Sequence, residues 1–221
     1  MPARPTAPSR STRRERDSEP ASGARVDEIR LAALELFATL GYRVTTMADI
    51  GAAVGIRGPS IYKHVASKQH LLVDIMTGTM DRLLAAQHEA LAGTAGARDD
   101  VAALVSVHVR HHALHRYETF VGNREIDSLD PAPRAHVLRQ RARYETTLRR
   151  AIEQGIDRGE FHVRSARLAS YAILDMGMGV SAWHRPGGQY SPDEVAEIYA
   201  AMALRLLDAG PGAVPEVPHT I

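Results

Sequence analysis

The sequence TTMADIGAAVGIRGPSIYKHVASK, residues 45–68, has the pattern of two short helices joined by a tight turn. Thr45 or Thr46 can cap the first helix, because a threonine hydroxyl accepts a hydrogen bond from a free amide of the first turn. Gly55 suits a left-handed turn, and the second helix is expected from Pro59 to about His64. This arrangement predicts a helix-turn-helix.

The side chains of this segment separate into a small core and an exposed polar face. The core is formed by Ile50, Val54, Ile56 and Ile61, and small residues for a close helix crossing stand at Ala48, Ala52 and Ala53. The exposed face of the second helix carries Arg57, Ser60, Tyr62, Lys63 and His64. Such donors and stacking rings suit DNA phosphates and base edges, so the segment indicates DNA binding.

The remaining chain has helical apolar periodicity and no sustained alternation typical of strands. Further helices are expected at about 26–40, from Ser67 to the glycine-rich break at 93–96, and at about 99–117, 119–129, 131–158, 165–184 and 191–208. Asp130-Pro131 and Ser191-Pro192 each place a capping side chain before a proline at the first helical position. The sequence therefore predicts an all-α fold of about nine helices.

These elements predict four segments. Residues 1–23 form a mildly basic, disordered arm with five arginines against three acids, either lying along DNA or solvated. Residues 24–70 form the helix-turn-helix domain, and residues 71–209 form a helical effector-binding and dimerisation domain. Residues 210–221 form a flexible tail, because three prolines stand among the last eleven residues.

Composition excludes several classes of protein. The 221 residues include no cysteine, which rules out a disulfide scaffold, thiolate catalysis, cysteine-ligated zinc and iron–sulfur clusters. The apolar runs near residues 168–183 are interrupted by Asp175 and are too short to span a bilayer. No apolar segment of a secretory signal follows the basic N-terminus, so we expect a cytoplasmic protein.

Charge and motif content favour a binding protein over an enzyme. Residues 1–70 carry 11 Lys and Arg against 7 Asp and Glu, although the whole chain has a net charge of only +1; a basic front end indicates a polyanionic partner. No P-loop, GxGxxG, GxSxG or HExxH motif is present. We therefore predict no enzymatic activity and no cofactor. The weaker alternatives are an adaptor and a helical hydrolase that uses the histidines below with Glu118 or Glu125.

About residues 25–72 resemble the N-terminal domain of the TetR family of bacterial transcriptional repressors. The matching residues are Leu40-Gly41-Tyr42, Thr45-Thr46, Ile50 through Ile56, Ser60 through Val65, Ser67-Lys68 and Leu71-Leu72. Val65 departs from the family, in which many members have phenylalanine. The resemblance implies a homodimer that binds a palindromic operator as a repressor, and a C-terminal domain whose small-molecule effector releases the DNA.

The same resemblance implies DNA contacts for individual residues. It places Thr46, Tyr62 and Lys68 against phosphates and adds Thr45 to the DNA-binding set. It places Arg57, Gly58, Ser60, Lys63 and His64 in the major groove. It also implies that the last two helices pair with those of a second copy in a four-helix bundle, through Tyr171, Leu174, Met178, Val195, Tyr199, Met202 and Leu206.

Four histidines at helical spacing mark the C-terminal half. His108, His111, His112 and His115 share one helix face. They are read either as a zinc or nickel site of a metal-responsive regulator, as the polar wall of a pocket, or as surface residues. Gly177 and Gly179 lower helix propensity by roughly 1 kcal/mol each, which indicates close approach of a ligand or a partner helix.

About residues 105–206 resemble a branch of the family that responds to acyl-CoA thioesters. The similarity rests on residues 120–131 together with Arg143-Tyr144-Glu145, Gly159-Glu160-Phe161 and Trp183 through Gly187. It implies that the effector is an acyl-CoA thioester or a related hydrophobic acid. We expect the effector site to contain Met76, Met80, Leu83, His108, His112, Asn123, Glu125, Met176 and Val180, with Arg141, Arg143 or Arg185 meeting phosphates.

Overall fold

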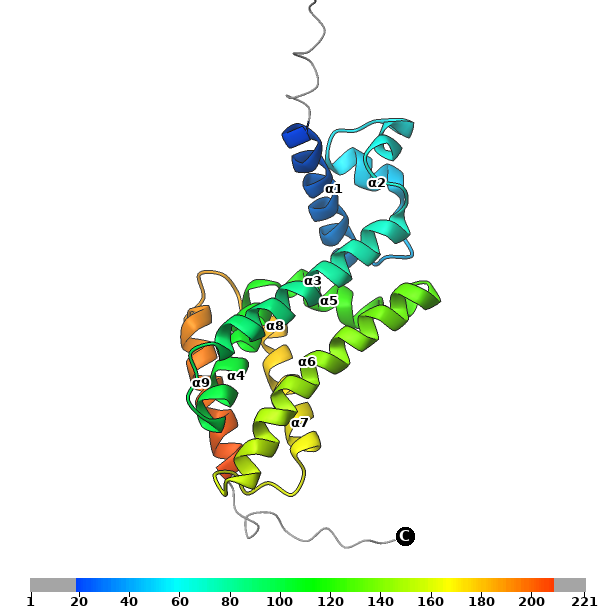
Figure 1. The fold of residues 1–221 in the computed structure, drawn as a ribbon. Helices are drawn as coiled ribbons and strands as arrows, with labels where there is room; N and C mark the ends of the chain where they lie inside the picture. Colours follow the sequence, from blue (N-terminus) through cyan, green and yellow to red (C-terminus); the bar gives the residue numbers. More distant parts are fainter. Residues whose placement is uncertain (1–18, 209–221) are drawn as a thin grey trace, which may run out of the picture. The chain divides into compact units, whose positions relative to one another are not determined.

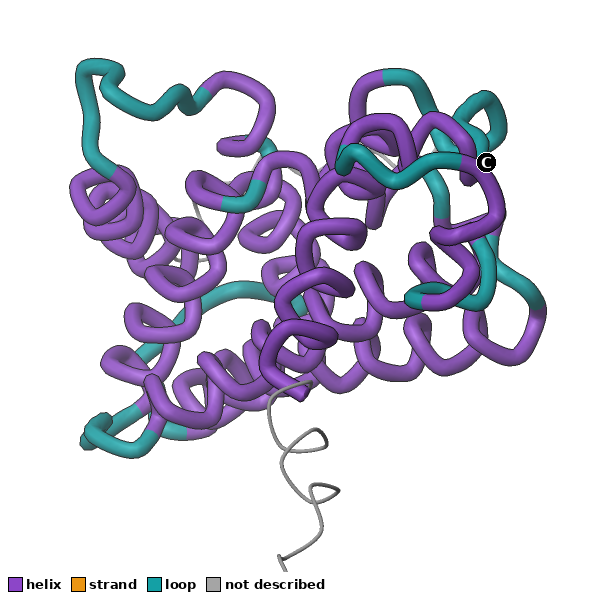
Figure 2. The backbone as a smooth tube through the Cα atoms, turned by 90° about the horizontal axis from the view of Figure 1, so that it is seen from above, coloured by secondary structure: helices purple, strands orange, loops and turns teal. Residues whose placement is uncertain are grey.

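A computed structural model describes residues 19–208, and all regular structure in that range is helical (Figure 1). Figure 2 shows the same range as helices joined by loops, without a strand. The predicted all-α fold is confirmed. The chain divides into two compact units between Leu72 and Val73.

The first unit contains α1 (Glu19–Thr39), α2 (Met47–Ala53), the 3₁₀ helix η1 (Gly58–Lys63) and the start of α3 (Lys68–Leu91). Helix α1 begins earlier than predicted, so residues 19–23 do not belong to a disordered arm. Pro20 fits this start, because the first turn needs no amide hydrogen. Residues 1–18 and 209–221, which hold the rest of the predicted arm and the predicted tail, lie outside the described residues.

A small core holds this unit together. It is formed by the buried side chains of Ile29, Ala33, Leu34, Phe37, Ile50, Ile61, Val65, Leu71 and Leu72. The close crossing predicted for Ala48, Ala52 and Ala53 is wrong, since all three are exposed. Gly51 takes that place: a Cβ there would lie 2.9 Å from the carbonyl oxygen of Ile56, so only a glycine lets the turn fold back so closely.

The second unit contains the rest of α3 and the helices that follow. These are α4 (Ala97–Leu114), α5 (Arg116–Arg124), η2 (Ile126–Ser128), α6 (Pro131–Asp157), α7 (Ala166–Met178), α8 (Val180–Trp183) and α9 (Pro192–Asp208). Helix α4 is central and packs against α6, α7, α8 and α9. The helix predicted over 165–184 is divided at Gly179, a residue of low helix propensity.

No helix within residues 19–208 combines the length and the apolar character needed to cross a membrane.

Candidate functional site

The helix-turn-helix begins with a capping box at Thr46. The amide of Asp49 donates to the Thr46 hydroxyl at 3.2 Å, and the Asp49 carboxylate accepts from the Thr46 amide at 2.8 Å. The carboxylate also accepts from the Thr46 hydroxyl, and these two bonds lower the pKa of Asp49. Gly55 follows α2 with φ of 71°, which confirms the predicted left-handed turn. The capping box at Thr46 therefore determines where α2 begins, and Gly55 allows the chain to turn after its end.

The polar side chains predicted to read DNA lie together on η1 and the turn before it. Arg57, Ser60, Tyr62, Lys63 and His64 are all exposed, and Tyr62 is 57% accessible. Across residues 23–208 none of the five forms a side-chain hydrogen bond or ion pair. Their donors are therefore available to a partner.

Thr45 does not belong to this exposed face. Its relative accessibility is 0%, and its hydroxyl donates to the carbonyl oxygen of Gly41 at 2.9 Å. The predicted DNA contact of Thr45 is wrong, because its side chain is buried and its hydroxyl bonds to the backbone just after α1.

Lys68 also differs from its prediction. Its ammonium group donates to the carbonyl oxygens of Thr45 at 2.7 Å and Tyr42 at 2.8 Å, and a third carbonyl, of Arg43, lies at 3.5 Å. The ammonium also stands 4.3 Å from the centre of the Tyr42 ring. An ammonium has three donors, and the loop carbonyls face all of them. The predicted phosphate contact is therefore not what this geometry supports.

The second unit encloses a cavity of about 600 Å³ between α3, α4, α5, α6 and α7. Six of the predicted effector residues line it, namely Met76, Met80, Leu83, His108, His112 and Asn123. Glu125, Met176 and Val180 do not line it: Glu125 accepts a hydrogen bond from Ser128 at 2.8 Å, and Val180 is buried in the main core.

The phase of α7 explains the error at Met176. The residues of α7 that line the cavity are Arg167, Tyr171, Leu174, Asp175 and Met178, spaced at i, i+4, i+7, i+8 and i+11. Met176 lies two residues from Met178, about 200° around the helix. Met178 therefore takes the role predicted for Met176, and Asn123 donates to its sulfur at 2.9 Å.

The predicted dimer residues divide into three groups. Tyr171, Leu174 and Met178 line the cavity. Val195 is buried in the core of the same chain, so its predicted place at a dimer interface is wrong. On α9, Met202 and Leu206 are exposed and Tyr199 is half-buried. Sequence reasoning missed two further exposed apolar side chains, Leu168 on α7 and Ile198 on α9.

Three of the four histidines, His108, His111 and His112, form part of one wall of the cavity. His108 is buried, and its Nε2 lies 2.9 Å from the carbonyl oxygen of Leu174. A carbonyl only accepts, so Nε2 carries the proton, and Nδ1 accepts from the Tyr144 hydroxyl at 3.1 Å. Burial lowers the pKa of His108 to about 4, which keeps the ring neutral, and raises the pKa of Tyr144.

His111 and His112 extend this wall, whereas His115 does not line the cavity. His112 Nδ1 lies 2.7 Å from the Thr119 hydroxyl, and His115 lies 3.3 Å from the Glu118 carboxylate. Burial also lowers the pKa of His111 to about 4. In the part of the chain that the structure describes, no group of three or more His, Asp or Glu is placed to hold a metal ion. The geometry favours the pocket wall.

Arg141 is a cation at the cavity with no carboxylate beside it. It is half-buried, and its Nη2 donates to the carbonyl oxygen of Gly122 at 2.7 Å. It has no ion pair among the described residues, and burial lowers its pKa. A partly desolvated guanidinium is normally paired, so Arg141 is suited to hold an anionic or carbonyl oxygen of a ligand. The phosphate role predicted as an alternative for Arg185 has no such support, since Arg185 donates to the carbonyls of Ala182 and His184.

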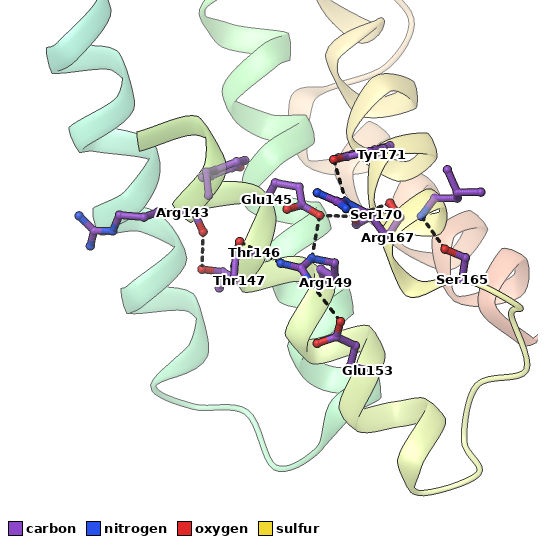
Figure 3. A network of polar contacts seen from close by, with 12 residues as sticks. Arg143, Glu145, Thr146, Thr147, Arg149, Glu153, Ser165, Arg167, Ser170 and Tyr171 are labelled. Atoms are coloured by element: carbon purple, nitrogen blue, oxygen red, sulfur yellow. Dashed lines mark hydrogen bonds and ion pairs between the residues drawn. The ribbon is translucent and has the colours of Figure 1, made fainter. Parts of the chain in front are cut away.

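A second set of charges borders the cavity where α6 and α7 meet (Figure 3). Glu145 accepts from the Ser170 hydroxyl at 2.6 Å and pairs with Arg149 at 3.2 Å. Arg149 also reaches Glu153, and Arg167 donates to the Tyr171 hydroxyl at 3.2 Å. Arg149 pairs with two carboxylates and Arg167 donates to a hydroxyl, whereas Arg141 donates to a backbone carbonyl.

Comparisons with known proteins identify the same family of regulators in both halves of the chain. A family model described as "Bacterial regulatory proteins, tetR family" matches residues 29–75. A second, described as "Tetracyclin repressor-like, C-terminal domain", matches residues 94–207. The chain is also 29% identical over 195 residues to the HTH-type transcriptional repressor KstR2 of Rhodococcus jostii RHA1, covering 85% of this chain and 93% of that protein.

Solved structures give the same result. A bacterial regulatory protein of the tetR family from Rhodococcus RHA1 is 32% identical, with a TM-score of 0.75 over 82% of this chain and 96% of its own. The ketosteroid transcriptional regulator KstR2 of Mycobacterium tuberculosis is 26% identical, with a TM-score of 0.77 over 83% of this chain and 94% of its own. All of these proteins are transcriptional regulators, which confirms the prediction that the chain is not an enzyme.

Proposed function

Because the chain belongs to the TetR family of bacterial transcriptional regulators, we propose that it represses transcription as a homodimer on a palindromic operator. The exposed and unengaged donors of the η1 segment support this proposal. Arg57, Ser60, Lys63 and His64 would face base edges in the major groove, while Tyr62 would contact phosphates. The phosphate contact predicted for Thr46 is not part of this proposal, because its amide and its hydroxyl both donate to Asp49. Gly58, which opens η1, would let the backbone approach the DNA. Chromosomal DNA lies in the bacterial cytoplasm, so that is where we place the protein.

The dimer would form through α7 and α9. Ile198, Met202 and Leu206 repeat every four residues along one exposed face of α9, and Leu168 is 67% exposed on α7. Apolar side chains that gather on one surface indicate an interaction site. A second copy of the same two helices would cover them by two-fold symmetry.

The effector would be a hydrophobic molecule with a carbonyl-derived polar head. The observation that carries this proposal is the cavity itself, in which methionine and leucine side chains face an arginine that has no carboxylate partner. Its volume of about 600 Å³ lies in the range of small-molecule sites. Methionines adapt to bulky shapes, and the relative described as a ketosteroid regulator supports a ring-shaped acyl body.

The polar head would be the carbonyl of a thioester or the carboxylate of a free acid. Arg141 would hold its oxygen, with Asn123 as a second donor. Such a ligand releases DNA only if it binds more tightly to a dimer state that fits the operator poorly.

Fluorescence anisotropy with a labelled DNA fragment from upstream of the protein's own gene tests this function. We expect nanomolar binding that is reversed by one of a panel of ring-shaped and straight-chain acyl-CoA thioesters and free acids. Arg141→Met should weaken release by about tenfold or more, as expected for a lost charged hydrogen bond, and leave DNA binding intact. The matched control is Arg134→Met on the same helix, because Arg134 does not line the cavity. Release by zinc or nickel alone would favour the metal-responsive alternative.

A further inference from the structure

The effector cavity has two polar regions with opposite hydrogen-bonding character. In one region Arg141 lines the cavity, and a guanidinium group only donates hydrogen bonds. The other region lies where the end of α4 meets the start of α5, at His112 and Glu118, which also line the cavity. We call these two residues the acceptor pair. Their chemistry concerns a second part of the ligand, separate from the head that Arg141 is suited to hold.

The hydrogen bonds of Thr119 determine which nitrogen of His112 carries the proton. The Thr119 hydroxyl has one hydrogen and donates it to the carbonyl oxygen of His115 at 3.1 Å. The same hydroxyl oxygen lies 2.7 Å from His112 Nδ1, so Nδ1 carries the proton and donates. Burial lowers the pKa of His112, which keeps the ring neutral. Its Nε2 therefore has a lone pair, to which no group within the described range donates.

Glu118 adds a carboxylate to the same region. Its side chain is 13% exposed, and one of its oxygens lies 3.3 Å from His115 Nδ1 and 3.8 Å from a guanidinium nitrogen of Arg82. Burial by itself raises the pKa of Glu118, but the hydrogen bond with His115 and the charge of Arg82 outweigh it, so the pKa is lowered. The ionised carboxylate only accepts hydrogen bonds. Because Arg82 already balances its charge, the region suits a neutral donor rather than a second cation.

The neighbouring ring of His111 also lacks a partner. His111 lines the cavity, and its ring centre is 5.3 Å from that of His112. Its Nε2 is buried and has no hydrogen-bond partner in the part of the chain that the structure describes, which is costly. A ligand hydroxyl donates to one group and accepts from another. A ketone only accepts, so it would leave the acceptor pair unpaired and face the charge of Glu118.

We propose that the effector carries a hydroxyl group that donates to the acceptor pair, in addition to the head held by Arg141. This inference rests on the proposed function, because it describes the ligand of the same cavity. The effector is then a hydroxylated hydrophobic acid or its thioester, and not the corresponding ketone. Helix α5 sets the spacing of the two groups: Glu118 stands one turn, or about 6 Å, before Gly122, whose carbonyl accepts from Arg141.

Calorimetry on the full chain tests this inference with three acids that differ at one ring position. The probes are 3-(trans-4-hydroxycyclohexyl)propionic acid, its 4-oxo analogue and unsubstituted 3-cyclohexylpropionic acid. Their flexible propionate lets the head and the ring oxygen span a turn of α5. The variants are His112→Phe, which keeps a ring and removes both nitrogens, and Glu118→Gln, which adds an amide donor. The matched controls are His136→Phe and Glu89→Gln, at exposed residues that do not line the cavity.

We expect the wild type to bind the hydroxy acid about tenfold more tightly than either of the other acids, as one added hydrogen bond to the acceptor pair predicts. His112→Phe should reduce this preference to less than about threefold. Glu118→Gln should raise the affinity for the ketone relative to the hydroxy acid by about fivefold or more, because the new amide donates to the ring oxygen. Both controls should match the wild type. A purely structural role would instead weaken the binding of all three acids equally.

Equal binding of the three acids by the wild type, tighter binding of the ketone, or no binding of any of them would overturn the proposal. Circular dichroism establishes that each variant is folded. If His112→Phe unfolds because it loses the bond to Thr119, Glu118→Gln decides the question alone, since an unchanged ratio of ketone to hydroxy acid affinity in that variant contradicts the proposal.

These results are distinguishable from a failure of the proposed function. If the hydroxy acid is preferred through the acceptor pair but no acid or thioester releases the operator, the hydroxyl recognition stands and the effector role of the cavity is wrong. If an acid releases the operator and a hydroxyl gives no advantage, the function stands and the hydroxyl recognition is wrong.

Discussion

Replacement of Lys68 by methionine should destabilise the helix-turn-helix unit without removing a DNA contact. Methionine keeps an unbranched apolar side chain and deletes the ammonium that bonds to the carbonyls of Tyr42 and Thr45 at 2.8 and 2.7 Å. A hydrogen bond to a charged group contributes about 1.5–3 kcal/mol. We take the lower end for each because Lys68 is half-buried, so the loss is about 3 kcal/mol for the two bonds. The contact with the Tyr42 ring adds to this loss.

Urea unfolding followed by circular dichroism measures this loss, and hydrogen exchange over residues 45–55 shows whether it falls on the helix-turn-helix. The matched control is Lys63→Met. Lys63 is exposed and has no side-chain partner among the described residues, so its replacement should change stability by less than about 0.5 kcal/mol. It should instead weaken specific operator binding by about 1–3 kcal/mol if it reads a guanine.

The salt dependence of operator binding gives the decisive comparison for Lys68. Each lost phosphate contact reduces the slope of log K against log salt by about one. We expect Lys68→Met to leave that slope unchanged under conditions where the variant is folded. Unchanged stability together with a slope reduced by about one would show that the ammonium faces a phosphate and that our reasoning from the loop carbonyls is wrong.

Two further predictions concern the second unit. Burial lowers the pKa of His108 from 6.5 to about 4. Between these two pH values the imidazole of His108 binds a proton in the unfolded chain but not in the folded chain. His108 alone should therefore lower the free energy of unfolding by about 2 kcal/mol between pH 7 and pH 5, in addition to the contributions of His111 and His112. Urea titrations in which His108→Gln shows the same fall as the wild type would contradict this. Met202→Glu should dissociate the proposed dimer in sedimentation experiments, while Leu114→Glu, at an exposed leucine of α4, should remain dimeric.

The elements predicted correctly are those set by neighbouring residues. The helix cap at Thr46, one of the two threonines predicted for it, the turn at Gly55 and the helix starts at Pro131 and Pro192 depend on residues within one turn. The apolar spacing of α3 likewise placed Met76, Met80 and Leu83 on one wall. Local capping and periodicity therefore specify where helices begin and which face is buried.

The errors arise where distant residues meet. Lys68 and Tyr42 are 26 positions apart, so the sequence cannot show that a loop folds back and takes the ammonium. Met176 and Met178 have the same chemistry, and only the packing of α7 against α4 and α6 decides which of them faces the cavity. Gly177 is an exception, since its predicted close approach is confirmed: a Cβ there would lie 2.4 Å from the His108 ring.

Three hydrogen bonds connect four walls of the effector cavity. Gln87 of α3 donates to the Tyr144 carbonyl of α6, the Tyr144 hydroxyl donates to His108 of α4, and His108 donates to the Leu174 carbonyl of α7. His108 has no spare nitrogen, so a ligand that bonds to it must break one of these links and pay for an unpaired buried group. A ligand that binds through Arg141 breaks none of them. We therefore expect effectors to be recognised at Arg141 and to change the spacing of α3, α6 and α7 as connected walls, because that route leaves these three hydrogen bonds intact.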